Sequence, residues 1–175
     1  MPSNLSEAPV SNPDTVRPLP DRTLWFWIRT WLPVALGILM ILIESTESMG
    51  ADHTSSWLRA IYQTIFGHIS DERWVHLHHY IRKMGHFIGY GLIGLAWLRA
   101  WWFTLPRARF FTDFALAMLG TATIASYDEW HQSFLPNRGS SPWDVLLDCA
   151  GAFTMQLIVY VYMHLTKPKQ LAHAA

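Results

Sequence analysis

The sequence predicts an all-α polytopic membrane protein, a bundle of four transmembrane helices with a short amphipathic interfacial helix between the first two spans. Three observations predict this class. Hydrophobic residues make up 51% of the 175-residue chain and charged residues only 15%, against about 25% in an ordinary soluble domain. The chain contains 10 Trp, a residue that favours the boundary between lipid and water. Four segments also approach the roughly 20 apolar residues that a spanning helix needs.

We place the four spans at residues 24–43, 84–105, 110–127 and 145–165. Arg29 lies near the start of the first span and Arg99 near the end of the second, so both side chains can reach the membrane surface. A soluble bundle of very apolar helices is the alternative. Tryptophans near the ends of the predicted spans argue against that alternative (Trp25, Trp27, Trp31, Trp101, Trp102 and Trp143).

Residues 44–83, between the first two spans, carry an amphipathic pattern. Trp57, Ile61, Ile65 and Ile69 recur at intervals of four, which is typical of a helix with one apolar face. Such a helix can lie flat on a membrane surface. A second short helix over residues 71–83 is expected to lead into the second span.

Basic residues set the expected orientation, because Lys and Arg accumulate in cytoplasmic loops. Eight fall on the side of the termini (Arg17, Arg22, Arg29, Arg99, Arg107, Arg109, Lys167 and Lys169) and five on the other (Arg59, Arg73, Arg82, Lys83 and Arg138). We therefore expect a multi-pass protein of the inner or plasma membrane with both termini in the cytoplasm. We expect residues 1–23 to form a disordered cytoplasmic leader, residues 24–165 the membrane domain, and residues 166–175 a cytoplasmic tail.

Composition excludes some partners and bonds. Thirteen basic residues balance thirteen acidic ones, so no net charge points to nucleic acid. Cys149 is the one cysteine, which excludes an intrachain disulfide. The sequence predicts neither a cofactor nor a metal site, and it leaves the oligomeric state open. We expect membrane lipids as partners.

The strongly polar residues converge on one predicted membrane face, the outer one. They are Glu44, Arg82, Lys83, His86, Asp128, Glu129, His131, Gln132, Arg138, Asp144 and Asp148. Asp148 lies a full turn inside the last span, where a charge costs about 2.5–3.5 kcal/mol and normally finds a partner. Because arginine can bind a carboxylate with two hydrogen bonds, we expect Arg82 and Arg138 to pair with Asp148 and with Asp128 or Glu129.

Two patterns have structural interpretations. Ser141 to Asp144 match a capping box with Pro at the first helical position, so Asp144 is expected to cap the last helix. Gly85 and Gly89 form a G-x-x-x-G pattern, which predicts a close helix contact. We interpret Tyr90 as a packing residue, and His76, His78 and His79 as a surface face rather than a metal site.

Three motifs in combination resemble the VanZ-like family. They are R-K-x-x-H-F-x-x-Y (Arg82, Lys83, His86, Phe87 and Tyr90), D-E-x-x-Q-x-F-x-P-x-R (Asp128, Glu129, Gln132, Phe134, Pro136 and Arg138), and an aspartate with small residues opening the last helix (Asp144, Asp148 and Gly151). The resemblance covers about residues 24–165. The family takes its name from a protein linked to resistance to teicoplanin, a glycopeptide that acts outside the cell on wall precursors. The chain departs from the pattern at Asn137, where Gly is common.

Three interpretations of the polar cluster remain open. The cluster could bind an anionic lipid, a lipid-linked wall precursor or a glycopeptide, and the resemblance implies a part in teicoplanin-type resistance or envelope function. It could instead catalyse a reaction on a lipid-linked substrate, with His86 or His131 beside Glu129 as acid and base, or with a metal on Asp128, Glu129 and His131. Third, it could be a purely structural polar network. The candidate site residues are Arg82, Lys83, His86, Asp128, Glu129, Gln132, Arg138 and Asp148, followed by Glu44, Tyr90, His131 and Asp144.

Overall fold

Five helices make up the part of the chain that the computed structural model describes, residues 22–46, 51–105, 109–135 and 140–166. They are α1 (Leu24–Glu44), α2 (Ala51–Phe66), α3 (Asp71–Thr104), α4 (Phe110–Gln132) and α5 (Pro142–Leu165). No strand occurs within these four stretches, which confirms the predicted all-α class. Most of the predicted leader and tail, and Arg138 and Asn137, lie outside the described residues.

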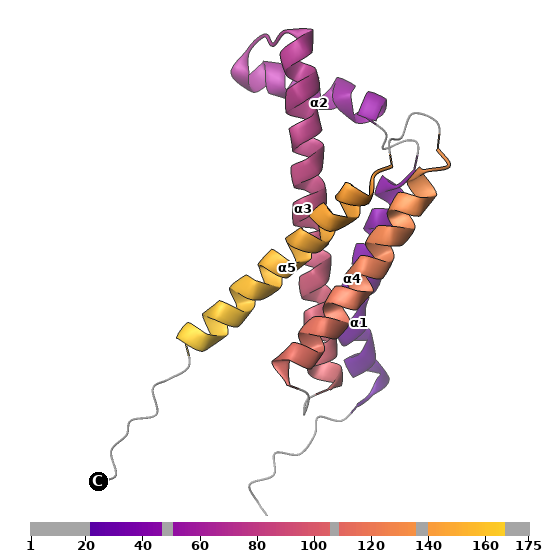
Figure 1. Cartoon of the computed structure of the whole chain (residues 1–175), viewed down its shortest axis with the longest axis vertical. Helices are drawn as coiled ribbons and strands as arrows, with labels where there is room; N and C mark the ends of the chain where they lie inside the picture. Colours follow the sequence, from indigo (N-terminus) through magenta and orange to yellow (C-terminus); the bar gives the residue numbers. More distant parts are fainter. Residues whose placement is uncertain (1–21, 47–50, 106–108, 136–139, 167–175) are drawn as a thin grey trace, which may run out of the picture.

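Helix α3 is the central element of the fold. It makes its most extensive contacts with α5, and further contacts with α4 and α1. Figure 1 shows α5 crossing α3; α4 packs against both of these helices, whereas α1 packs mainly against α3. Because successive bundle helices alternate in direction, the end of α1, the end of α4 and the start of α5 lie at the same end of the bundle (Figure 1). The fold therefore brings the three predicted polar segments together.

The helix predicted over residues 71–83 and the predicted second span form one continuous helix, the 34-residue α3. The two elements were predicted separately because their composition changes from polar to apolar at Met84. No proline interrupts the chain there, so the backbone hydrogen bonds continue unbroken. One end of α3 therefore extends beyond α5, and α2 lies across this end (Figure 1).

A sharp turn docks α2 on the first turns of α3. Gly67, whose φ is +85°, lies just after the end of α2, in a conformation that glycine adopts without strain. Trp74 Nε1 then donates a hydrogen bond to Ser55 Oγ at 2.7 Å, and Arg59 pairs with Asp71 at 2.6 Å. Ile69, predicted as part of the α2 apolar stripe, lies beyond the helix and is buried.

The remaining stripe of α2 is exposed. Trp57, Ile61 and Ile65 are each at least half exposed on this helix, and Phe66 continues the apolar surface at its end. An apolar face that no other helix of the fold covers is typical of a helix on a membrane surface. This exposure agrees with the predicted amphipathic character of the segment.

Glycine permits the closest helix contact, but not at the predicted pair. A Cβ added to Gly85 or Gly89 would meet nothing within 4 Å, whereas one added to Gly151 of α5 would lie 2.1 Å from the carbonyl oxygen of Phe87 in α3. A Cβ at Gly94 would lie 2.7 Å from Ala152 Cβ. The G-x-x-x-G interpretation is therefore wrong. The α3–α5 crossing depends on Gly94, further along α3, and on Gly151 of α5.

Two helices are long and apolar enough to cross a membrane. They are α1, with a mean hydropathy of 1.9 over its most apolar window, and α5, with 1.6. Polar residues lower the apolar character of the other two predicted spans. His86 and Arg99 lie in α3, and Asp113, Asp128 and Glu129 lie in α4. The described part of the chain thus contains two candidate spans by length and composition, and the crossing of α3 and α4 stays a prediction.

Candidate functional site

Asp148 pairs with a histidine. Its carboxylate is 2% exposed, and its Oδ1 lies 3.4 Å from Nδ1 of His86, which α3 presents to α5. Neither atom has a hydrogen-bond partner among the described residues, so each depends on the other for electrostatic compensation. The predicted Arg82–Asp148 pair is wrong, because residues 82 and 86 are one turn apart on α3 and only the deeper one reaches the buried turn of α5.

Asp144 binds a lysine instead of capping its own helix. Lys83 Nζ forms an ion pair with Asp144 Oδ1 across the α3–α5 contact. Ser141 is the N-cap of α5, and its Oγ accepts a hydrogen bond from the backbone N–H of Trp143 at 3.3 Å. The Ser141 N–H, which a capping box would give to Asp144, donates instead to Glu129 Oε1. The capping interpretation of Asp144 is therefore wrong, and Glu129 takes that role from α4.

Tyr90 connects α3 to the last carboxylate. Its hydroxyl donates a hydrogen bond to Asp128 Oδ2 at 3.0 Å, with both side chains buried, so Tyr90 has a polar contact in addition to the packing role that we expected. Its ring also stacks on His86, with centroids 6.1 Å apart. As a result, Asp128, Glu129, Asp144 and Asp148 each have a specific partner within the protein.

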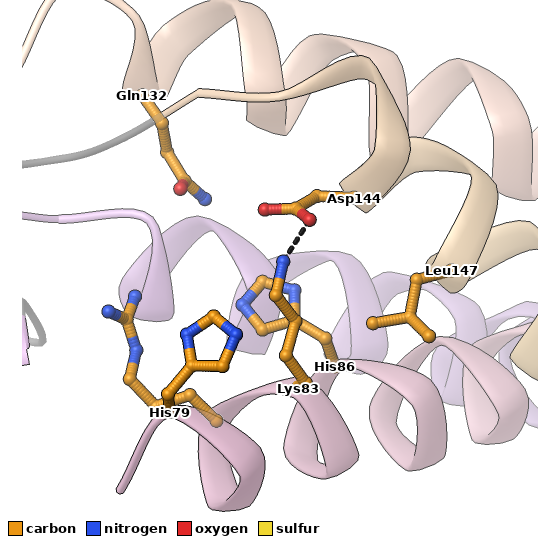
Figure 2. A pocket seen from close by; sticks show the side chains of 7 residues that line it. His79, Lys83, His86, Gln132, Asp144 and Leu147 are labelled. Atoms are coloured by element: carbon orange, nitrogen blue, oxygen red, sulfur yellow. Dashed lines mark hydrogen bonds and ion pairs between the residues drawn. The ribbon is translucent and has the colours of Figure 1, made fainter. Parts of the chain in front are cut away.

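A pocket of about 240 Å³ opens beside this network. It is lined by His79, Arg82, Lys83, His86, Gln132, Asp144 and Leu147. Figure 2 shows His79, Lys83 and His86 on one helix, with Gln132 and Asp144 facing them across the pocket. Three segments far apart in the sequence thus build one polar pocket at the end of the bundle.

The charges on the pocket wall differ from those of the network behind it. Asp144 is the one acidic side chain of the lining, and Lys83 pairs with it. Among the described residues, Arg82 has no hydrogen-bond or ion-pair partner. Two histidines, His79 and His86, supply further nitrogen atoms. The wall therefore presents an unpaired guanidinium and two imidazoles, a set that suits an anionic group.

A second pocket of about 290 Å³ shares Arg82 and His86 with the first. It is otherwise lined mainly by α1 and α2 (Glu44, Thr54, Trp57 and Leu58), with Ile81 and Gly85 from α3. Its apolar residues contrast with the polar lining of the first pocket. Arg82 and His86 therefore stand between a polar space and a more apolar one.

The structure does not bring every predicted residue to these pockets. His131 Nδ1 lies 3.0 Å from Ser45 Oγ, within hydrogen-bonding distance, and links α4 to the residue after α1. Asp128, Glu129 and Asp148 are buried in the network behind the pocket. Gln132 lines the pocket itself. In the described part of the chain, no group of three His, Cys, Asp or Glu residues is placed to hold a metal ion, which contradicts the metal alternative on Asp128, Glu129 and His131.

His79 and Leu147 line the pocket but were not among the predicted site residues, and His79 had been assigned to a surface face. A signal was available in the spacing. His79, Lys83 and His86 occupy positions i, i+4 and i+7, and Arg82 fits the same stripe at i+3, so all four share one helix face. Extending α3 unbroken through Lys83 would have placed His79 on that face.

Comparison with known proteins gives one match. A family model described as VanZ/LLP1 matches residues 30–163, which is well over half of the 175-residue chain. The match includes all of α2, α3 and α4, most of α1 and α5, and the residues that line the two pockets at Arg82. No curated protein and no solved structure matches the chain.

Proposed function

The chain belongs to the VanZ/LLP1 family, and we propose that it is an integral membrane protein that binds the phosphate-bearing headgroup of an anionic lipid at the pocket around Arg82. A lipid-linked cell-wall precursor falls within this chemical class, because it joins a phosphate to an apolar chain. The larger number of basic residues on the side of the termini supports an outward-facing pocket, on the side of the membrane where such precursors are used.

One observation carries this proposal. Among the described residues, Arg82 has no hydrogen-bond or ion-pair partner, whereas the neighbouring carboxylates of α4 and α5 each contact another group of the protein. The cluster predicted from the sequence counts three basic residues against five acidic ones, and that count alone favours a cation. However, Asp148 lies against His86, Asp128 accepts from Tyr90, and Glu129 accepts from a backbone N–H. The positive charge of Arg82 therefore dominates the wall of the polar pocket, where the one carboxylate, Asp144, is paired with Lys83, and guanidinium binds phosphate in a bidentate manner.

The adjoining apolar pocket supports a lipid over a soluble phosphate. Trp57, Leu58 and Ile81 line it, and it begins at the same two residues, Arg82 and His86, that border the polar pocket. A ligand with a phosphate between a polar head and an apolar chain fits this pair of spaces. The exposed apolar stripe of α2 would keep the opening against the lipid surface.

We propose a part in teicoplanin-type resistance as a consequence of such binding. A protein that holds a lipid-linked wall precursor at the outer face competes with a glycopeptide for that precursor. The measurement is the teicoplanin concentration that inhibits growth of cells expressing the wild-type protein or the Arg82→Gln variant. A resistance role predicts that expression raises this concentration and that the substitution removes the effect.

The His86–Asp148 pair favours a second candidate function, acid–base catalysis on the bound lipid. A buried carboxylate that faces one imidazole nitrogen fixes the tautomer and leaves the other nitrogen for proton transfer. His86 also lines both pockets, so its ring lies beside the proposed phosphate. Incubation of the purified protein with a phosphate-bearing lipid, followed by detection of released phosphate or alcohol, separates this candidate from binding alone.

Lipid binding by purified Arg82→Gln protein tests the main proposal. The matched control is Arg73→Gln, which removes an exposed arginine from the same helix but outside the pocket. Wild type and control should bind vesicles containing an anionic phospholipid or a lipid-linked precursor with equal affinity, and Arg82→Gln about tenfold more weakly, as expected for loss of roughly 1.4 kcal/mol. Equal binding by all three proteins, at equal thermal stability, would refute the proposal.

A further inference from the structure

A third pocket lies at the opposite end of the bundle, between the start of α1 and the end of α3. Its volume is about 290 Å³. The lining contains two arginines, Arg29 and Arg99, three aromatic side chains, Trp25, Phe26 and Phe103, and two threonines. None of the lining residues is acidic. The pocket is therefore basic and aromatic, and it is separate from the site around Arg82.

Pro33 fixes Arg99 in this pocket. A proline inside a helix has no N–H, so the carbonyl four residues earlier, that of Arg29, loses its helical donor. Arg99 Nη1 supplies the missing donor, at 3.1 Å from Arg29 O and 3.2 Å from Thr30 O. The Arg99 guanidinium also lies over the ring of Phe103, 5.1 Å from its centroid. These contacts hold one edge of the guanidinium and leave its other N–H groups for a ligand.

Arg29, the second arginine of the pocket, shares it with the Arg99 guanidinium, which is held by the two carbonyl groups. No hydrogen bond or ion pair to the Arg29 side chain is found among the described residues, and no carboxylate lines the pocket. Two guanidinium groups that share a pocket repel each other unless an anion lies between them. Arginine pairs with phosphate through two parallel hydrogen bonds, so a phosphate group compensates both charges.

We propose that this pocket binds the phosphate of an anionic phospholipid in the leaflet opposite the Arg82 pocket. The surroundings favour a lipid over free phosphate. Trp25 is 63% exposed beside the pocket, and tryptophan is enriched at the level of lipid headgroups. Leu32 and Leu36 expose the adjoining face of α1 and provide a surface for the acyl chains. The basic-residue count places this end in the cytoplasm, whose leaflet is rich in anionic lipid.

The site holds this lipid as a structural partner of the α1–α3 contact. Arg29 is on α1 and Arg99 on α3, so a phosphate bound to both links the two helices. Binding to the folded state stabilises it by mass action. The thermal midpoint of the protein should therefore rise with the mole fraction of anionic lipid, independently of any ligand in the Arg82 pocket.

Thermal unfolding of the full chain in nanodiscs tests the site. One series contains phosphatidylcholine alone, and the other contains phosphatidylcholine with 30% phosphatidylglycerol, an anionic phospholipid. The variants are Arg29→Gln, Arg99→Lys, which keeps the charge but loses the planar fork, and the control Arg73→Gln at the other end. A third arm adds 10 mM inorganic phosphate to protein in neutral nanodiscs.

We expect phosphatidylglycerol to raise the midpoint of wild type and Arg73→Gln by several degrees. The rise should be at most half as large in Arg29→Gln and in Arg99→Lys. An equal rise in all four proteins would overturn the proposal. A rise produced by inorganic phosphate alone, and lost in Arg29→Gln, would overturn the lipid source. Because Arg29→Gln leaves the Arg82 pocket intact, loss of this effect is distinguishable from loss of headgroup binding at the outer face.

Discussion

His86 of α3 lies against Asp148 of α5, with Nδ1 and Oδ1 3.4 Å apart. The contact joins two helices that cross at a backbone approach permitted by Gly151. Placing a carboxylate in an apolar span carries an energetic cost that a partner must offset. An imidazole from the neighbouring helix offsets this cost and, unlike an arginine, can lose its charge when no proton is available.

A double-mutant cycle should detect this pair. We expect His86→Gln and Asp148→Asn each to lower the free energy of unfolding. The double variant should lose less of this free energy than the sum of the two single losses, with a coupling energy of about 1–3 kcal/mol. The measurement is the free energy of unfolding in detergent. The cycle of His86→Gln with Asp144→Asn is the control, because Asp144 pairs with Lys83 and should give a coupling below about 0.5 kcal/mol. Equal couplings in the two cycles would contradict a specific pair.

Substitution of Gly151 should disrupt the α3–α5 crossing. A Cβ at this position would lie 2.1 Å from a backbone oxygen of α3, and a backbone atom cannot move aside without separating the helices. We expect Gly151→Ala to cost about 1–3 kcal/mol, the range of overpacking substitutions.

Gly89→Ala is the matched control, since a Cβ there meets nothing within 4 Å. This variant should be neutral or more stable by about 0.5–1 kcal/mol, because alanine loses less backbone entropy in a helix. Both stabilities can be read from thermal unfolding followed by circular dichroism. A Gly151→Ala protein as stable as Gly89→Ala would show that α3 and α5 do not cross with their backbones in contact at Gly151.

Loss of the Tyr90 hydroxyl should leave Asp128 without its hydrogen-bond donor. The hydroxyl lies 3.0 Å from Asp128 Oδ2, and Asp128 Oδ1 has no hydrogen-bond partner among the described residues. Tyr90→Phe should therefore cost about 1–3 kcal/mol, as for a buried acceptor that loses its donor.

The control for Tyr90 is Tyr80→Phe, which changes an exposed tyrosine of the same helix and should change stability by less than about 0.5 kcal/mol. Chemical unfolding of both variants in the same detergent provides the comparison. A Tyr90→Phe variant as stable as Tyr80→Phe would contradict a stabilising hydrogen bond from Tyr90 to Asp128.

The convergence of polar residues was predictable, whereas their pairing was not. Alternation of the helices fixes which segment ends meet, and this follows from span number and order alone. Pairing depends on the rotation of each helix about its axis, which helix packing sets. Gly91 and Gly94 determine the packing of α3 on α5, and the sequence did not distinguish these glycines from Gly85 and Gly89. That rotation directs His86, and not Arg82, toward Asp148.

The continuity of α3 shows a second limit of sequence reasoning. A change in composition at Met84 suggested two elements, but a helix ends only where a residue or a cap interrupts its backbone hydrogen bonds. The single helix moves His79 into the pocket and presents His78 to α2. In contrast, Arg138 was assigned a partner from charge alone, and it lies outside the described residues.

Acidification should weaken the contact of α2 with α3 through His78, which precedes the predicted span. Its Nε2 lies 3.2 Å from Thr54 Oγ1 in α2, and its ring stacks on Trp74. Burial, and secondarily the charge of Arg82, lowers the pKa of His78 below its ordinary value of 6.5. The folded state therefore binds a proton less readily than the unfolded state does. The stability that His78 contributes is full above pH 6.5 and declines as the pH falls from there toward the lowered pKa.

Hydrogen exchange of the α2 amides between pH 8 and pH 5 measures this effect, after correction for the intrinsic rates. Protection of α2 should fall below pH 6.5 in wild type and in the control His76→Gln. This control removes an exposed histidine that lies about half a helical turn from His78. In His78→Gln, protection should be nearly independent of pH, because glutamine keeps a polar group near Thr54 but does not titrate. A wild-type-like decline in His78→Gln would assign the pH dependence to another group. Since α2 borders the apolar pocket beside Arg82, the same titration predicts weaker lipid binding at acidic pH in wild type than in His78→Gln.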